Sequence, residues 1–344
     1  MSLILLGNMH TERTEFFLKA AAEMLASGEL REPVQFIPLP SFTRDTDFNF
    51  QPLQNHIVKV DPPPPESYLV DNLNTVMERY HTFLLDLQSV PGIKLLNSGN
   101  AIWDTLDKFT CKQRLQNEGL PVTPALTDSR GALLRITSHD ELIETMREKR
   151  ISQVFIKPRF GSGAAGVAAF RHNFKTGKET METCAELNGT RLYNTRKLKK
   201  TNSADRIRPL IDHVLALEAI VEEWIPKATH NGKAFDLRAV FQSGRLEFIV
   251  ARQSNGAITN LHLNDLAASD FDLSRSMRLE IESLCRKAAA LFPGLNTAGF
   301  DILLQKHTMY ILIIEINGQG DLLFKDIFAD NRIFKAQLNA MKSL

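Results

Sequence analysis

The chain has 344 residues, enough for two or three packed units. Its 41 Lys and Arg nearly balance its 40 Asp and Glu, which argues against a nucleic-acid protein that relies on bulk charge. Cys111, Cys184 and Cys285 lie far apart and form no CxxC pair, so the sequence predicts neither a disulfide framework nor a cysteine metal site. With no apolar run of membrane-spanning length and no signal-peptide core, we expect a soluble cytoplasmic protein.

The first hundred residues have the pattern of an α/β unit. Leu3–Leu6 predicts a buried strand, an apolar stripe through Phe17 and Met24 predicts a helix, and Val34–Ile37 predicts a second strand. The loop Gly7–His10 could hold a ligand at the carboxyl end of its strand, although a plain turn is the stronger interpretation without a GxGxxG pattern.

The next segments alternate between loop and helix. Pro38–Pro65 is rich in loop residues, Tyr68–Leu87 predicts a helix, and Lys94–Leu96 predicts a short strand. Asp104–Glu118 predicts another helix, with Lys108 in its first turns. Taken alone, such a lysine is usually solvated.

Val154–Val167 combines a buried strand, a lysine and a glycine loop. Lys157 ends the apolar run, and Pro158 stops the strand because it cannot donate a backbone hydrogen bond. The small residues that follow let backbone N–H groups approach an anion, and they include Gly161, Ser162, Gly163 and Gly166. A hairpin with a glycine-rich turn and a surface lysine is an equal alternative for this stretch alone.

Helical and polar segments surround this stretch. Ser138–Arg150 precedes it as a predicted helix with an N-terminal cap. Lys175–Arg208 is polar and predicts an excursion or a flexible lid. Its basic cluster Arg196–Lys200 is most simply a solvated surface, although it could face an anionic substrate. Ala219–Trp224 then predicts a strand.

The last part of the chain predicts two hairpins around one helix. Phe235–Phe241 and Leu246–Val250 form the first hairpin, and Ser274–Phe292 is the strongest helix of the sequence. Phe300–Gln305 and Met309–Ile316 form the second hairpin.

Three oxygen-bearing residues lie in the second hairpin. If its strands pair antiparallel, Asp301 and Glu315 come together, and Asn317 shares a sheet face with Glu315. Two such carboxylates repel unless a cation lies between them, and hard oxygen ligands suit Mg²⁺, with Mn²⁺ as the alternative. Solvated acids at strand ends are the weaker interpretation, because apolar residues flank both positions.

Two arginines lie between these segments. Arg238 shares a strand face with Asp236, and Arg252 follows the next strand. Arginine suits two-pronged contacts with phosphate or carboxylate, whereas a surface ion pair between Asp236 and Arg238 is an equal alternative.

The order of these motifs over roughly residues 104–323 resembles the ATP-grasp superfamily. Asp107-Lys108 resembles the first lysine helix of that family, Lys157 with its glycine loop resembles the second, and Val221–Pro226 resembles the adenine-binding strand. The segments Asp236-Leu237-Arg238 and Glu315-Ile316-Asn317 resemble motifs of the RimK-like, glutathione-synthetase-like branch.

A narrower resemblance, to an uncharacterised bacterial ATP-grasp family, rests on Glu223–Ala228 and Thr259–Leu263. The sequence departs from the family pattern around Arg196–Lys200 and at Gly318–Leu322.

The resemblance implies an α/β fold of three parts. These would be an N-terminal Rossmann-like domain over residues 1–100, a helical linker with a small lid domain over 101–225, and a C-terminal metal-binding domain over 226–344. ATP would lie between the last two.

The resemblance also implies roles for single residues. Lys108 and Lys157 would offset phosphate charge, and the glycine loop would close over the phosphates. The other implied contacts are adenine at Glu222, Glu223 and Ile225, ribose at Asp236, the γ-phosphate or an acyl phosphate at Arg238 and Arg252, the acceptor at Asn260, and Mg²⁺ at Asp301, Glu315 and Asn317.

The function implied is an ATP-dependent carboxylate–amine ligase that works through an acyl phosphate. Its partners would be small-molecule or peptide carboxylates and amines, without nucleic acid or membrane, and the oligomeric state stays open. An ATP-grasp kinase acting on a hydroxyl and a non-catalytic nucleotide-binding regulator are the alternatives.

Overall fold

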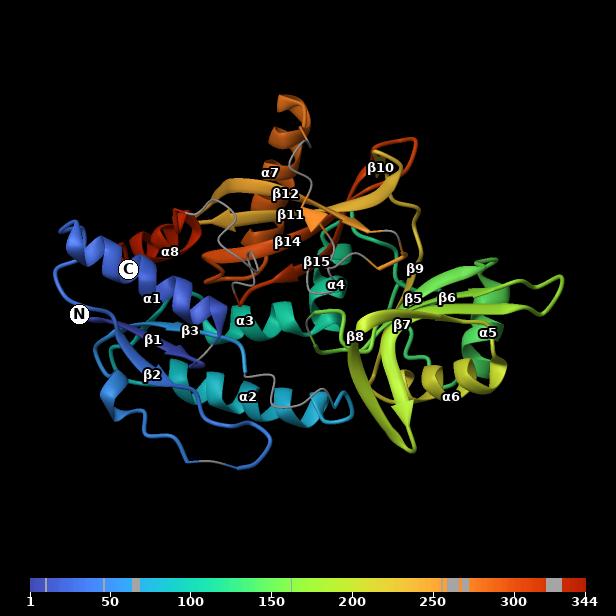
Figure 1. Cartoon of the computed structure of the whole chain (residues 1–344), viewed down its shortest axis with the longest axis horizontal. Helices are drawn as coiled ribbons and strands as arrows, with labels where there is room; N and C mark the ends of the chain where they lie inside the picture. Colours follow the sequence, from blue (N-terminus) through green and yellow to red (C-terminus); the bar gives the residue numbers. More distant parts are fainter. Residues whose placement is uncertain are drawn as a thin grey trace.

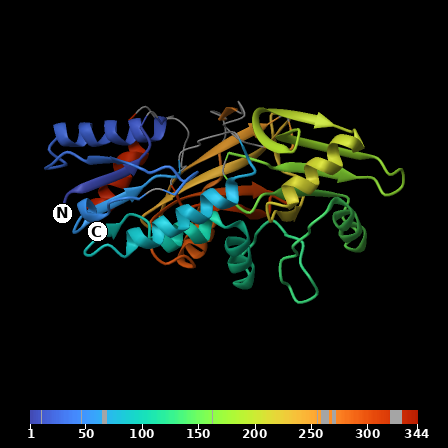
Figure 2. The same cartoon turned by 90° about the horizontal axis from the view of Figure 1, so that it is seen from below.

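The computed structural model describes residues 1–9, 11–45, 47–63, 69–161, 163–254, 256–258, 266–267, 272–319 and 330–344. The described strands form three sheets, which Figure 1 shows as an N-terminal unit, a large antiparallel sheet and a separate lid sheet. Figure 2 shows the same three parts following one another along the molecule.

The N-terminal unit is the predicted α/β unit. Its four strands are all parallel, in the order β2-β1-β3-β4. The strands are β1 (Leu3–Gly7), β2 (Gln35–Pro38), β3 (Ile57–Val60) and β4 (Lys94–Leu95). Helices α1 (Glu12–Ala26) and α2 (Leu73–Gln88) connect them as crossovers.

The prediction that Pro38–Pro65 is mainly loop is wrong in one respect. A short 3-10 helix, η1 (Gln51–Leu53), and the inner strand β3 both lie within it. Lys59 interrupts the apolar pattern of β3, yet it is buried in an ion pair with Asp61. The strand was not predicted because a buried lysine, paired with a carboxylate, interrupts its apolar pattern.

The single helix predicted over Asp104–Glu118 is also wrong. The structure has two helices, α3 (Gly99–Leu106) and α4 (Lys108–Asn117). Asp107 lies between them with an extended backbone, and its carboxylate accepts hydrogen bonds from the first N–H groups of α4. Asp107 therefore marks the boundary between two helices, because it caps the start of the second one.

The lid sheet has the strand order β8-β7-β6-β5-β9, with antiparallel pairing throughout. The strands are β5 (Gln153–Lys157), β6 (Ala168–His172), β7 (Glu179–Asn188), β8 (Arg191–Thr201) and β9 (Ile220–Glu223). Helices α5 (His139–Glu148) and α6 (Ala204–Leu215) contribute to its core. The predicted excursion over Lys175–Arg208 is therefore mainly a hairpin, with one irregularity in its register, followed by a helix, and Met181 and Leu192 are buried in it.

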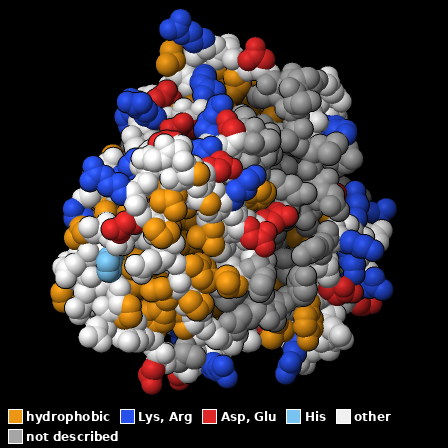
Figure 3. Space-filling view, turned by 60° about the vertical axis from the view of Figure 1, so that its left-hand side comes forward, with side chains coloured by type: hydrophobic (Ala, Val, Ile, Leu, Met, Phe, Trp, Pro, Cys, Tyr) orange, Lys and Arg blue, Asp and Glu red, His pale blue; other side chains and the backbone are white. Residues whose placement is uncertain are grey.

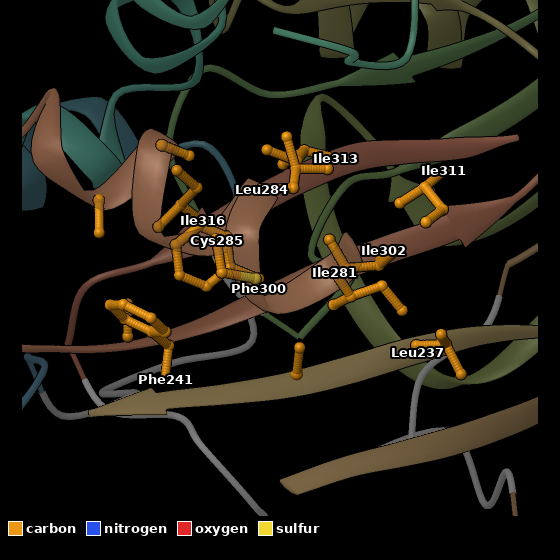
Figure 4. Packing of buried hydrophobic residues seen from close by; sticks show 14 of the residues in the cluster. Leu237, Phe241, Ile281, Leu284, Cys285, Phe300, Ile302, Ile311, Ile313 and Ile316 are labelled. Atoms are coloured by element: carbon orange, nitrogen blue, oxygen red, sulfur yellow. The ribbon is translucent and has the colours of Figure 1, made fainter. Parts of the chain in front are cut away.

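The largest sheet holds both predicted C-terminal hairpins. Its order is β13-β12-β11-β14-β15, and β10 pairs with β11. The strands are β10 (Thr229–His230), β11 (Lys233–Gln242), β12 (Arg245–Ser254), β13 (Leu266–Ala267), β14 (Thr297–Leu304) and β15 (Ile311–Asn317). Helix α7 (Arg275–Ala290) packs on one face, where Ile281, Leu284 and Cys285 meet Phe300 and Ile316 (Figure 4).

A last helix, α8 (Arg332–Lys342), was not anticipated from the sequence. Its residues Phe334, Leu338 and Met341 are buried in one cluster with Phe17 and Met24 of α1. The end of the chain thus packs against its beginning. The division into units at 1–100, 101–225 and 226–344 stays a prediction.

The end of the molecule that comes forward in Figure 3 carries a gathering of hydrophobic side chains, with Lys and Arg mostly around it.

Among the described helices, none is long and apolar enough to cross a membrane.

Candidate nucleotide and metal site

A pocket lies where α4, the lid and the last strand of the large sheet meet. Three lysines and two acids from these elements share it. The pocket is lined by Thr105, Lys108, Cys111, Lys112, Leu115, Lys157, Glu222, Ile314, Glu315 and Ile316. The structure therefore brings together Lys108, Lys157, Glu222 and Glu315, four of the residues predicted for the nucleotide and the metal.

The carboxylate of Glu222 is the centre of the lysine cluster. It lies 2.7 Å from Lys157 Nζ and 3.0 Å from Lys112 Nζ, and it accepts a hydrogen bond from the Thr123 hydroxyl. Burial raises the pKa of this carboxyl, but the two lysines outweigh burial and bring the pKa down to about 2. The carboxylate of Glu222 is therefore ionised and paired with both lysines.

The three lysines differ in their electrostatic surroundings. Burial lowers the pKa of Lys108 and of Lys112, although nearby carboxylates oppose this effect. Burial also opposes the charge on Lys157, but Glu222 and Glu315 outweigh it and raise the pKa of Lys157. Such a cluster of cations, balanced by few acids, suits a polyanionic ligand such as a nucleotide phosphate chain.

The glycine loop begins against α4. Lys108 Nζ donates to the carbonyl of Gly161 at 2.8 Å, so the lysine and the loop are in direct contact. Gly166 has φ +70°, and a Cβ there would lie 2.6 Å from Pro158 Cγ. Gly163 also has a positive φ, of 66°. Gly166 requires glycine because its backbone turns left-handed in a crowded place, and the positive φ of Gly163 also favours glycine.

Strand β9, where the resemblance implies the adenine contacts, makes backbone hydrogen bonds on both sides. The N–H of Glu223 donates to the carbonyl of Pro124, and the N–H of Trp224 donates to the carbonyl of Gln153. Ile225 follows directly after these bonds. The adenine contacts of Glu222, Glu223 and Ile225 stay a prediction.

The predicted metal residues lie on adjacent strands as expected. Asp301 pairs directly with Glu315 in the antiparallel register, and Asn317 pairs with Gly299. Asn317 Nδ2 lies 3.4 Å from Glu315 Oε1. Burial, followed by the repulsion from Glu315, raises the pKa of Asp301 against the effect of two arginines. Burial also opposes the charge on Glu315, but Lys108 and Lys157 outweigh it and lower the pKa of Glu315.

These three side chains fit a hard divalent cation. They supply two carboxylates and an amide oxygen from one sheet edge, and the repulsion between the two acids is what a bound cation would relieve. Among the described residues no group of three His, Cys, Asp or Glu could hold a metal, so the amide of Asn317 and ligand oxygens would have to complete the set.

The two predicted arginines bind carboxylates in this structure. Arg238 Nε lies 2.6 Å from Asp301 Oδ1, and Arg252 Nη2 lies 3.1 Å from Asp301 Oδ2. Asp236 is nearly fully buried and contacts both Arg252 Nε and Lys227 Nζ, at 2.7 and 2.9 Å. A continuous ion-pair network therefore runs from Lys227 through Asp236 and Arg252 to Asp301 on β14.

Sequence reasoning missed Lys112 and Lys227. Lys112 lies four residues after Lys108, which places both on one face of α4, and that spacing was the available signal. Lys227 lies four residues after the last residue of β9, and the sequence gives it no pattern of its own. Two predicted site residues, Ser162 and Asn260, lie outside the described residues.

Gly318, which directly follows β15, is the first residue of one departure from the ATP-grasp pattern, and it lies in a crowded place. A Cβ at Gly318 would lie 2.3 Å from Thr105 Oγ1, and the carbonyl of Gly318 accepts a hydrogen bond from Asn97. The strand with Glu315 and Asn317 is thus fixed against α3 where it ends.

The architecture is that of the ATP-grasp fold. The chain is similar over 98% of its length to D-cycloserine synthetase DcsG, with TM-score 0.61, 13% identity and 100% of that chain covered. It is also similar to the ATP-grasp ligase PsnB in complex with a phosphomimetic variant of a minimal precursor, Mg and ADP (TM-score 0.57, 14% identity, 99% of both chains).

A third similar structure is the D-alanyl-alanine synthetase A of Vibrio cholerae, with TM-score 0.56, 13% identity and coverage of 99% of this chain and 98% of that chain. No protein-family model matches the sequence, and no curated protein matches it. The structural similarity therefore establishes the fold, and at 13–14% identity it does not resolve a branch within it.

Proposed function

We propose that this protein is an ATP-dependent carboxylate–amine ligase that forms an amide through an acyl phosphate and releases ADP and phosphate. The observation that carries the proposal is the convergence of Lys108, Lys112 and Lys157 on a pocket that also contains Glu315 of the paired metal strands. Among structures of the same fold, PsnB has been seen with Mg and ADP, and MdnC with a precursor peptide.

In this proposal the lysines offset the charge of the phosphates, and Glu222 keeps Lys112 and Lys157 in place when no nucleotide is bound. Asp301, Glu315 and Asn317 would hold Mg²⁺ (or Mn²⁺), which stabilises negative charge during phosphoryl transfer. Arg238 and Arg252 contact the carboxylate of Asp301 in this structure, and in the proposal each guanidinium group would also donate hydrogen bonds to the transferred phosphoryl group.

No nucleophilic side chain is required for this chemistry. The carboxylate oxygen of the acid attacks the γ-phosphorus and ADP leaves. The amine then attacks the carbonyl carbon of the acyl phosphate, phosphate leaves, and the amine loses its proton. Positioning and electrostatics carry both steps. The substrates would be a small-molecule or peptide carboxylate and an amine.

The proposal is tested by trapping the intermediate. The full chain is incubated with MgATP, hydroxylamine and pools of amino acids, small acids and short acidic peptides, and both ADP and hydroxamate are measured. We expect a hydroxamate in amounts equal to ADP with the correct acid. Arg252→Lys should lose most of the product while retaining ATP binding, since lysine cannot make a two-pronged contact.

A kinase of the same fold is the second candidate, because the basic residues Lys197, Lys199 and Lys200 of β8 would suit an anionic substrate. Lys199 and Lys200 already contact Glu186 and Glu182, which weakens this support. A phosphorylated hydroxyl product without hydroxamate would establish the kinase. Nucleotide binding without any ADP formation would favour a regulator.

A further inference from the structure

Asp107 joins a helix start to the glycine loop through one buried carboxylate. The N–H groups of Phe109 and Thr110 donate to its Oδ1, which caps α4. Arg159, two residues after β5, binds the same carboxylate with two parallel contacts, Nε to Oδ1 at 3.0 Å and Nη2 to Oδ2 at 2.7 Å. Burial raises the pKa of Asp107, but these hydrogen bonds outweigh burial and lower the pKa.

The two residues after Arg159 contact the same pair of helices. Phe160 is 3% exposed and packs on Trp103 of α3, with ring centroids 4.9 Å apart. Gly161 accepts the hydrogen bond from Lys108 Nζ, and the N–H of Lys108 donates to the carbonyl of Arg159. The first half of the glycine loop is therefore attached to α3 and α4 at three successive residues.

We propose that Arg159 is a positioning residue for phosphate binding. It holds the start of the glycine loop and the first turn of α4 as one unit, so that Lys108 and Lys112 keep a fixed place relative to the loop. Neither Arg159 nor Asp107 lines the pocket, so the effect passes through these lysines. The inference rests on the proposed nucleotide site and adds a residue that the ligand does not touch.

A purely structural role is the competing explanation, because Arg159 Nη1 also contacts Glu218 Oε2, next to the end of α6. The two roles differ in how ligand affinity depends on the number of phosphates. Misplaced lysines weaken ligands with a phosphate chain and spare AMP, whereas a loosened lid weakens all adenine nucleotides by the same factor.

The test is calorimetry of the full chain with AMP, ADP and a non-hydrolysable ATP analogue, each with Mg²⁺. Arg159→Lys keeps the charge but loses the two parallel contacts. We expect the analogue to bind about 10- to 100-fold more weakly, the equivalent of one charge-assisted hydrogen bond. AMP should bind as it does to the wild type. Asp107→Asn should show the same pattern, and it keeps a cap acceptor for α4.

Arg135→Ala is the matched control. Arg135 binds the other oxygen of Glu218, at 2.8 Å, in a more exposed position, so its removal should leave all three affinities unchanged. Unchanged binding of the analogue to Arg159→Lys, or equal losses for AMP and the analogue, would overturn the inference and leave the ligase proposal intact. A wild-type chain that binds no adenine nucleotide would overturn the nucleotide site and this inference with it.

Discussion

The side chain of Glu222 is the acid on which the lysine cluster depends. Glu222→Gln would leave Lys112 and Lys157 buried beside a neutral amide. We expect a loss of about 3–5 kcal/mol in the free energy of unfolding at pH 7, which is typical when one partner of a buried ion pair is removed. Urea denaturation of the wild type and the variant measures this loss.

The pH dependence of stability provides a second test of the Glu222 carboxylate. Because its folded pKa is lowered from 4.5 to about 2, its contribution to stability is present above pH 4.5 and is lost as the pH falls toward 2. The stability difference between wild type and Glu222→Gln should therefore shrink below pH 4.5. Glu186→Gln is the control, since its half-exposed pair with Lys199 should contribute about 0–1 kcal/mol. Equal losses in both variants would contradict the role of Glu222.

Glu315 offers the test of the metal. Glu315→Gln keeps the shape of the side chain and removes its charge, so the pairing of β14 and β15 should survive. We expect at least about a 100-fold higher Mg²⁺ requirement for ADP formation, since even residues behind metal ligands commonly cost 10- to 100-fold. A Mg²⁺ titration of ADP release measures it, with Glu282→Gln on α7 as the control. A normal titration curve would show that Glu315 is no metal ligand.

Residues at the ends of apolar strands were the ones that the sequence revealed. Lys157, Asp301 and Glu315 each interrupt an apolar run, and a charge in such a place needs a partner. Lys112 was not found, because a helix lysine gives no such contrast until the tertiary structure buries it. For Glu222 the family resemblance implied a contact with adenine. No sequence signal shows that two lysines from other segments meet its side chain.

At the scale of elements, the hairpin of β7 and β8 differs most from expectation. A polar composition predicted an excursion or a flexible lid, but the two strands pair on either side of an irregularity between Thr183 and Ala185, and they bury Met181 and Cys184. A strand with one exposed face needs apolar residues only at alternate positions. The polar composition of this segment therefore did not indicate a hairpin. Most of the other strands and helices were predicted, because their apolar periods are regular. The exceptions include β3, the break between α3 and α4, and α8.

This hairpin should resist hydrogen exchange. We expect amides in the middle of β7, which is paired on both sides with β6 and β8, to exchange slowly with or without nucleotide. Residues 163–166 should exchange fast in the free protein and more slowly with MgADP, as a loop that closes over phosphates would. Hydrogen-exchange mass spectrometry at peptide resolution distinguishes the two segments. Fast amide exchange of β7 in the free protein would support the original prediction of a flexible lid.

At the scale of the whole molecule, α8 completes the N-terminal unit. Phe334 is 5% exposed and packs edge-on against Phe17 and stacked on Phe16 of α1. Phe334→Ala should destabilise the protein by about 3–5 kcal/mol, as for other buried aromatic residues. Thermal unfolding, with hydrogen exchange of α1 as a local readout, measures the effect.

Phe174→Ala is the control for this variant, because Phe174 is 38% exposed in the lid and should contribute much less. If Phe334→Ala unfolds like the wild type and α1 keeps its protection, the packing of α8 does not stabilise the N-terminal unit.

The placement of α8 has a consequence for how the chain is made. The last strand of the parallel sheet is complete at residue 95, but the helix that covers Phe17 and Met24 ends at Lys342. At about 5–20 residues per second, residues 96–344 take roughly 12–50 s to leave the ribosome. Until α8 has been made, the first unit to be synthesised leaves this apolar surface uncovered, although the lid sheet has its whole sequence from residue 223 onward. We therefore expect the part of the protein that is translated first to complete its packing only after the lid.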